Sequence, residues 1–177
     1  MDYRRNRTPG AMFFFTVVTA GRQPVFADPV QVARLRAVTK AVRARLPFDI
    51  VAAVVLPDHL HSLWQLPPED GNYATRWGLI KAGFTRGNGL PDAARGRPAR
   101  GERGVWQPRY WEHRIRDDRD LSNHLDYIHF NPVRHGLCAA PWEWPWSSFG
   151  KWVRLGMYPS RWEMPTPPTV PHSRFDP

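Results

Sequence analysis

A chain of 177 residues, 42% of them hydrophobic, is long enough to form one domain with a hydrophobic core. The single cysteine, Cys138, excludes an internal disulfide, and the longest apolar stretches have the length of strands, which excludes a transmembrane helix and a signal peptide. The formal net charge of +9 comes almost entirely from arginine, which favours a nucleic-acid partner, although an arginine bias is also the mark of a GC-rich genome.

The first elements along the chain are a strand and a helix. The aromatic and β-branched run Met12–Thr19 is typical of a central strand. A helix is expected to begin at Pro29 with Asp28 as its N-cap, because proline suits the first helical position. Pro47 is expected to stop this helix.

A hairpin and a second helix follow. The apolar run Ile50–Leu56 predicts a buried strand, and residues 57–58 are a turn signal. The segment His59–Leu66 is therefore predicted to be the returning strand. A second helix is predicted over Tyr73–Phe84.

Residues 87–104 differ in kind from the rest of the chain. Arginine, glycine and proline dominate, and large apolar side chains are almost absent, which predicts a flexible loop. The loop is either a solvated insertion without a role or a basic flap that closes over a phosphate backbone.

The last elements are a strand over Val105–Ile115 and a third helix. Acidic residues at positions 117–118 suit the start of this helix. We expect the helix to end or kink at Asn131, because the residue before a proline disfavours helical geometry. The segment from Pro141 to Val153 is rich in tryptophan, which either stacks on bases or packs against the sheet.

The order strand, helix, strand, strand, helix, strand, helix is that of a split βαβ arrangement. It predicts an α+β fold, an antiparallel sheet with helices packed on one face, followed by a Trp-rich C-terminal extension. We expect a single domain over residues 1–163 and a proline-rich tail over 164–177.

The most informative motif is the pair His59 and His61. Side chains two residues apart in a strand share one face, so the two imidazoles can converge on one metal ion. Leu60 would point to the other face. The hairpin strand that carries the pair is expected near the middle of the sheet.

A second motif lies on the third helix. Tyr127 and Asn131 are four residues apart and so lie on one helical face, with His124 on the same stripe. A histidine pair on a strand, a tyrosine on a helix and a polar ligand one turn later suggest metal-assisted DNA cleavage by a tyrosine nucleophile.

Three segments together resemble the REP-associated tyrosine transposases. They are the Pro-Asp-His-Leu-His run that ends at His61, the segment Trp106–Arg116, and the segment Tyr127–Leu137. This family belongs to the HUH (His-hydrophobic-His) superfamily of single-strand nucleases, alongside the transposases of the smallest bacterial insertion sequences. The resemblance extends from Phe14 to about residue 162.

The resemblance implies a ferredoxin-like fold and a metal-dependent endonuclease and strand-transferase that acts on single-stranded DNA at repetitive palindromic hairpins. Tyr127 matches the nucleophile, which would form a 5′-phosphotyrosine intermediate. His59 and His61 match the metal ligands, and Asn131 occupies the position of the third ligand, which is often glutamine in relatives. The expected cofactor is a divalent cation, Mg²⁺ or Mn²⁺.

Candidate DNA contacts are basic residues on the second helix, in the loop and on the last strand: Arg76, Lys81, Arg95, Arg97, Arg100, Arg103, Arg109, Arg114 and Arg116. Glu112 is either a second-shell partner of the metal or an ion-pair partner of the neighbouring arginines. His124 is either a second-shell residue that orients the phosphate or moves a proton, or a histidine satisfied within the core.

An alternative function is that of a domesticated protein that binds DNA hairpins without cleaving them, with Tyr127 kept for packing. A metal-dependent hydrolase of a small molecule is a third possibility, against which the positive charge argues. The expected partner is single-stranded or hairpin DNA and not a membrane, the protein being a monomer or a homodimer. The expected location is cytoplasmic and nucleoid-associated.

Overall fold

The computed structural model describes residues 8–86 and 104–162. The predicted order of strands and helices is confirmed as far as the third helix: the elements are β1 (Met12–Val18), α1 (Pro29–Arg45), β2 (Asp49–Val55), β3 (His59–Gln65), α2 (Tyr73–Thr85), β4 (Trp111–Arg114) and α3 (Asp118–Arg134). A short helix that was not predicted, α4 (Phe149–Arg154), follows. Short 3₁₀ turns follow β1 and α3.

The strands form one antiparallel sheet in the order β2-β3-β1-β4. The strand β3 therefore lies inside the sheet, between β2 and β1, as the sequence predicted. The antiparallel α+β architecture is confirmed, and the hairpin of β2 and β3 is closed by the turn at 57–58.

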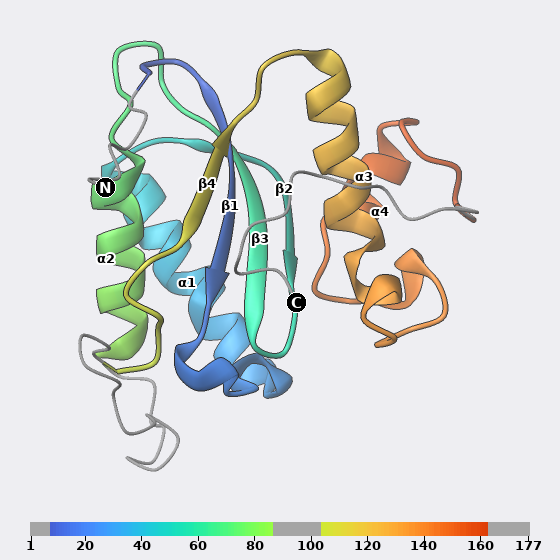
Figure 1. Cartoon of the computed structure of the whole chain (residues 1–177), viewed down its shortest axis with the longest axis horizontal. Helices are drawn as coiled ribbons and strands as arrows, with labels where there is room; N and C mark the ends of the chain where they lie inside the picture. Colours follow the sequence, from blue (N-terminus) through green and yellow to red (C-terminus); the bar gives the residue numbers. More distant parts are fainter. Residues whose placement is uncertain (1–7, 87–103, 163–177) are drawn as a thin grey trace.

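Helices cover both faces of this sheet. α1 and α2 lie on one face, as expected, whereas α3 lies against the opposite face, together with the C-terminal α4 (Figure 1). The physical reason is that β1, β2 and β3 carry large apolar side chains on both faces, so each face needs a cover. The expectation of helices on one face therefore holds for α1 and α2 but not for α3.

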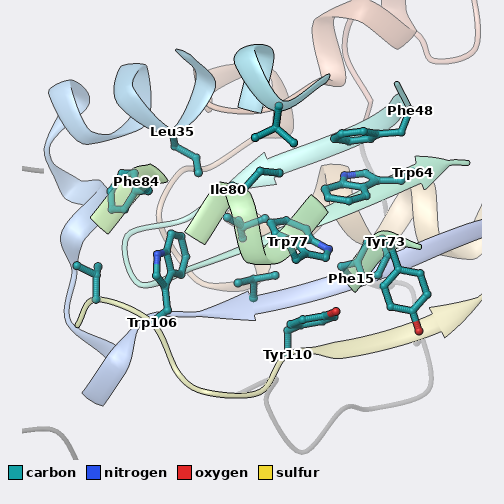
Figure 2. Packing of buried hydrophobic residues seen from close by; sticks show 14 of the residues in the cluster. Phe15, Leu35, Phe48, Trp64, Tyr73, Trp77, Ile80, Phe84, Trp106 and Tyr110 are labelled. Atoms are coloured by element: carbon teal, nitrogen blue, oxygen red, sulfur yellow. The ribbon is translucent and has the colours of Figure 1, made fainter. Parts of the chain in front are cut away.

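The larger core lies between the sheet and the pair α1 and α2 (Figure 2). Phe15 of β1 packs against Tyr73 and Trp77 of α2, with ring centroids 5.2 and 5.6 Å away. Trp64 of β3 stacks on Trp77, with ring centroids 4.4 Å apart, and packs against Phe48, with ring centroids 4.0 Å apart. Several of the nine tryptophans are thus core residues.

The boundaries of α1 follow the predicted signals. The Asp28 side chain accepts a hydrogen bond of 2.9 Å from the Val30 backbone N–H, and Pro29 is the first helical residue. The helix ends at Arg45, before Pro47.

Two predicted boundaries were wrong. The strand expected over Val105–Ile115 is reduced to Trp111–Arg114, with an isolated bridge between Trp106 and Thr19. Pro108 interrupts it, because proline has no N–H to donate to a strand ladder.

The helix α3 does not end at Asn131. It continues through Pro132 to Arg134, where proline in the last turn removes a single helical hydrogen bond. The end is set instead by Gly136, whose φ of +66° favours glycine, and by a hydrogen bond of 2.9 Å from the Leu137 N–H to the Pro132 carbonyl.

The tryptophan-rich segment after α3 pairs with the edge of the sheet. The Val55 N–H donates to the Trp146 carbonyl at 2.9 Å, and the Ser148 N–H donates to the Ala53 carbonyl at 2.8 Å. The Trp144 indole N–H also donates to the Val55 carbonyl, at 2.9 Å. Packing therefore explains Trp144 and Trp146, and the edge strand β2 is covered.

Two of the predicted segments fall largely outside the described residues. They are the loop over 87–104, except Gly104, and the tail over 164–177. Among the helices that the structure describes, none is both long enough and apolar enough to cross a membrane.

Trp64→Ala is expected to lower the free energy of unfolding by about 3 to 5 kcal/mol, because it leaves a cavity between Trp77 and Phe48. Denaturant unfolding measures this change. Trp142→Ala is the matched control, because that side chain is 41% exposed, and its stability should match that of the wild type. Equal losses in the two variants would contradict the packing described.

The buried His129 makes the stability depend on pH. Its Nε2 is hydrogen-bonded to the Ser148 hydroxyl at 2.8 Å, and burial lowers the pKa of His129 to about 3. The unfolded chain binds a proton below the ordinary histidine pKa of about 6.5, so His129 makes the folded state lose stability as the pH falls from there toward 3.

We expect His129→Gln to reduce this loss by about 1.4 kcal/mol per pH unit between about pH 5.5 and pH 4. Denaturant unfolding at several pH values compares the two slopes. Identical slopes for the wild type and the variant would show that His129 titrates normally in the folded protein.

Candidate metal and nucleophile site

The pair His59 and His61 lies on the face of β3 that α3 covers. Both side chains are buried, and their ring centroids are 5.0 Å apart. Leu60, between them, belongs to the core on the α1 and α2 side. The structure thus places the two imidazoles next to each other, as the alternation along a strand requires.

Asp58 and Arg22 orient His59. The His59 Nδ1–H donates to the Asp58 carboxylate at 2.5 Å, and the Arg22 guanidinium donates to the same carboxylate at 3.0 Å. Partial burial would raise the pKa of Asp58, but the hydrogen bonds from His59 and Arg22 outweigh burial and lower the pKa to about 2. In the neutral imidazole, a proton on Nδ1 leaves the lone pair on Nε2, and this is the form that binds a metal.

His61 is held by the neighbouring strand. Its Nδ1 is hydrogen-bonded to the Thr16 hydroxyl of β1 at 2.9 Å. Burial lowers the pKa of His61 well below its usual range, and the charges of His59, His135 and Arg134 lower it further. A histidine that stays neutral keeps a lone pair for a metal ion at physiological pH.

Tyr127 of α3 lies over this histidine pair. Its ring centroid is 5.1 Å from that of His61 and 6.0 Å from that of Phe14. The guanidinium carbon of Arg134 lies 5.4 Å from the tyrosine ring centroid, in a cation–π contact. This contact places a positive charge beside the tyrosine ring.

Asn131 lies one turn beyond Tyr127 on α3 and is 1% exposed. Within the described part of the chain, its amide oxygen and nitrogen have no hydrogen-bond partner, and neither does the Nε2 of His59. Buried polar atoms are almost always paired. A divalent cation would satisfy both the imidazole nitrogen and the amide oxygen, so these residues fit a metal ion.

A second cluster lies on the same face of the sheet and contains His113, Asp120 and His124. One ligand atom of each lies within 4.8 Å of the others, a spacing that a metal ion could use. The Asp120 carboxylate accepts hydrogen bonds from His113 at 2.8 Å and from the Arg116 side chain at 3.1 Å. Burial would raise the pKa of Asp120, but these donors lower it to about 2.

His124 is fixed in one tautomer. Its Nδ1 donates to the Asp120 backbone carbonyl at 2.7 Å, because a carbonyl only accepts. Burial lowers the pKa of His124, so the ring is neutral. Phe14 separates this ring from the metal candidates: its centroid is 4.8 Å from that of His124 and 5.4 Å from that of His61.

Glu112 does not lie near the histidine pair, which contradicts a second-shell role. It is paired with Phe15 across the sheet and therefore points to the α1 and α2 face. Its carboxylate accepts a hydrogen bond of 3.0 Å from the Tyr73 hydroxyl.

One of the candidate DNA contacts, Arg76, is structural instead. Arg76 is 2% exposed and donates to the carbonyls of Asn72 and Pro47 at 3.0 and 2.8 Å. The Lys81 ammonium donates to the Gln107 carbonyl at 3.0 Å. Arg76 is therefore not available to a phosphate, whereas the half-buried Lys81 stays a candidate contact.

The remaining basic candidates divide into two groups. Exposed side chains are found at Arg109, Arg114 and Arg116, the last of which is 63% exposed while paired with Asp120. The four loop arginines lie outside the described residues: Arg95, Arg97, Arg100 and Arg103.

Sequence reasoning missed four residues of this site: Arg22, Asp58, Arg134 and His135. The ring centroid of His135 is 5.3 Å from that of His59. Asp58 was assigned to the turn alone, although an acidic residue directly before a histidine pair is the signal for its role. Arg134 and His135 lie one turn beyond Asn131, which helical periodicity would have indicated.

The chain is similar to known proteins over most of its length. No family model matches the chain. A Haemophilus influenzae protein named as a REP-associated tyrosine transposase is 44% identical over 165 residues, which cover 91% of this chain and 92% of that protein. The Escherichia coli REP-associated tyrosine transposase is 39% identical over 161 residues, which cover 91% of this chain and 90% of that protein.

A solved structure is also similar over nearly the whole chain. It is that of a REP-associated tyrosine transposase bound to a REP hairpin, with a TM-score of 0.80 and 36% sequence identity. The match covers 98% of this chain and 99% of that one.

Proposed function

The chain belongs to the family of REP-associated tyrosine transposases, and on that basis we propose that it cuts and rejoins single-stranded DNA beside palindromic hairpins. Tyr127 is the nucleophile. The observation that carries this proposal is the buried tyrosine ring 5.1 Å from His61, on the face where His59 presents its Nε2.

His59, His61 and Asn131 are the residues that would hold a divalent cation. Mixed nitrogen and oxygen donors fit Mg²⁺ or Mn²⁺, with manganese the better match to imidazole. When bound, the cation supplies charge neutralisation at the scissile phosphate. Asp58 fixes the donor tautomer of His59, and Thr16 fixes the ring of His61.

Tyr127 attacks the phosphorus atom. The new bond joins its phenol oxygen to phosphorus while the bond from phosphorus to the 3′ oxygen breaks. The products are a 5′-phosphotyrosine and a free 3′-hydroxyl, which takes up the proton that the phenol loses. The number of phosphoester bonds is unchanged, so a 3′-hydroxyl of another strand can reverse the step and complete strand transfer.

Basic side chains are available to contact the DNA phosphates. Arg134 lies against the Tyr127 ring, and Arg109, Arg114 and Arg116 are exposed for phosphate contacts. The similar protein of known structure was solved with a REP hairpin, which supports hairpin DNA as the partner of this chain. The net charge of +9 on this chain suits a DNA partner.

Tyr127→Phe should abolish the covalent protein–DNA adduct while leaving DNA binding intact, because it removes only the attacking oxygen. The assay uses single strands that contain palindromes from around the gene, labelled at either end, with Mn²⁺ or with EDTA, and separated under denaturing conditions. We expect an adduct that carries only the 3′ portion of the strand and forms only with metal.

Tyr73→Phe is the matched control, because it removes a hydroxyl from a buried tyrosine on the opposite face of the sheet and should still form the adduct. Salt-sensitive binding by the wild type without any adduct would contradict the proposal. It would favour a hairpin-binding protein in which Tyr127 serves for packing.

We expect substitutions in the two histidine clusters to differ in their effect on metal binding. His59→Ala should weaken Mn²⁺ binding by more than about tenfold, because even partners of metal ligands contribute about 10- to 100-fold. His113→Ala should leave Mn²⁺ binding unchanged. Isothermal titration of each purified variant with MnCl₂ measures both, and the reverse pattern would move the metal to the His113, Asp120 and His124 cluster.

A further inference from the structure

A cavity of about 270 Å³ lies on the α1 side of the sheet, away from Tyr127. Its floor includes Leu60 and Trp64 of β3, and Trp77 of α2 lines it as well. Figure 2 shows Trp64, Trp77 and Leu35 gathered beneath α1. The residues Trp146–Ser148, which pair with the edge of β2, form another wall.

The interior of this cavity suits a flat ring. Pockets of about 300 to 1,000 Å³ hold drug-sized ligands, so this smaller volume suits one planar ring system. The half-buried indole of Trp146 lines the cavity and offers aromatic surface, whereas Trp64 is already stacked between Trp77 and Phe48. Aromatic side chains stack on unpaired bases with little dependence on sequence.

The rim of the cavity is basic. Arg36 and Lys40 lie one turn apart on α1, line the cavity and are exposed. The Arg36 guanidinium lies 5.2 Å from the Trp146 ring centroid, where it can also stack on a base. Within the described residues neither side chain forms an ion pair, so both charges are available to an anionic partner.

Arg43 completes the basic wall but is already engaged. Its guanidinium donates to the Phe48 carbonyl at 2.8 Å and lies 3.5 Å from the Asp49 carboxylate. The charge complementarity of the rim therefore rests on Arg36 and Lys40.

We propose that this cavity binds one unpaired nucleotide of the single-stranded DNA that flanks the hairpin, with the base inside and the adjacent phosphates on Arg36 and Lys40. An apolar interior with two cations at its mouth matches the two halves of a nucleotide. The inference rests on the proposed function, since it assumes a single-stranded DNA substrate. It adds a contact on the face of the sheet opposite to the nucleophile.

The test uses a hairpin with a single-stranded flank that carries 2-aminopurine at successive positions, and the same hairpin without a flank. Binding is measured by 2-aminopurine fluorescence and by titration at several salt concentrations. The variants are the double change Arg36→Ala and Lys40→Ala, which removes the rim charge, and Thr39→Phe, which fills the cavity. Arg45→Ala is the control, because Arg45 is exposed on the same helix but does not line the cavity.

For the wild type we expect one flank position to be quenched on binding. The double variant should lose that quenching, and its salt dependence should fall by about 1.4 in logarithmic slope, because each phosphate contact on a single strand contributes about 0.7. Thr39→Phe should lose the quenching without a comparable change in slope. All variants should bind the unflanked hairpin as the wild type does.

If both cavity variants bind the flanked hairpin as Arg45→Ala does and quench the same base, the proposal is overturned. The covalent adduct is assayed in the same samples. Its absence in the wild type contradicts the cleavage function, whereas its presence with an unaffected flank contradicts only the nucleotide cavity.

Discussion

The strand β3 is buried on both faces, and the alternation of its side chains determines which residues join the larger core and which form the site. Leu60 and Trp64 pack under α1 and α2, which fixes the register of the strand through the larger core. With that register fixed, His59 and His61 must point to the opposite face. A shift of one residue would place Trp64 against α3 and the histidines in the apolar core. The packing of Leu60 and Trp64 on one face therefore determines that His59 and His61 lie on the other.

Two carboxylates organise the histidines on the α3 face. Asp58, held by Arg22, fixes the tautomer of His59 and leaves its Nε2 for a metal ion. Asp120 connects α3 with His113 of β4, and its backbone carbonyl orients His124. The hydrogen bond between Asp120 and His113 holds the first turn of α3 against β4. The position of Tyr127, two turns later on the same helix, depends on this contact.

Local signals predicted much of this arrangement. The Asp28 cap, the hairpin, and the placement of Tyr127 and Asn131 on one helical face each depend on residues close in sequence. The errors at the site concern contacts between segments that are distant in the sequence, whereas the wrong ends of β4 and α3 have local causes. The face to which Glu112 points is set by its pairing with Phe15, and the burial of Arg76 is set in part by the carbonyl of Pro47, neither of which the composition of the segment reveals. The cover of α3 over the second face likewise follows from the apolar side chains on both faces of the completed sheet.

The central claim is that the oxygen of Tyr127 becomes covalently joined to DNA. The most direct measurement is to isolate the protein after reaction with a palindromic single strand and Mn²⁺, digest it with trypsin and a nuclease, and locate the added nucleotide by tandem mass spectrometry. We expect a nucleotide 5′-phosphate on Tyr127 and on no other residue. A phosphate-linked nucleotide on a different tyrosine, or on a serine, would contradict it.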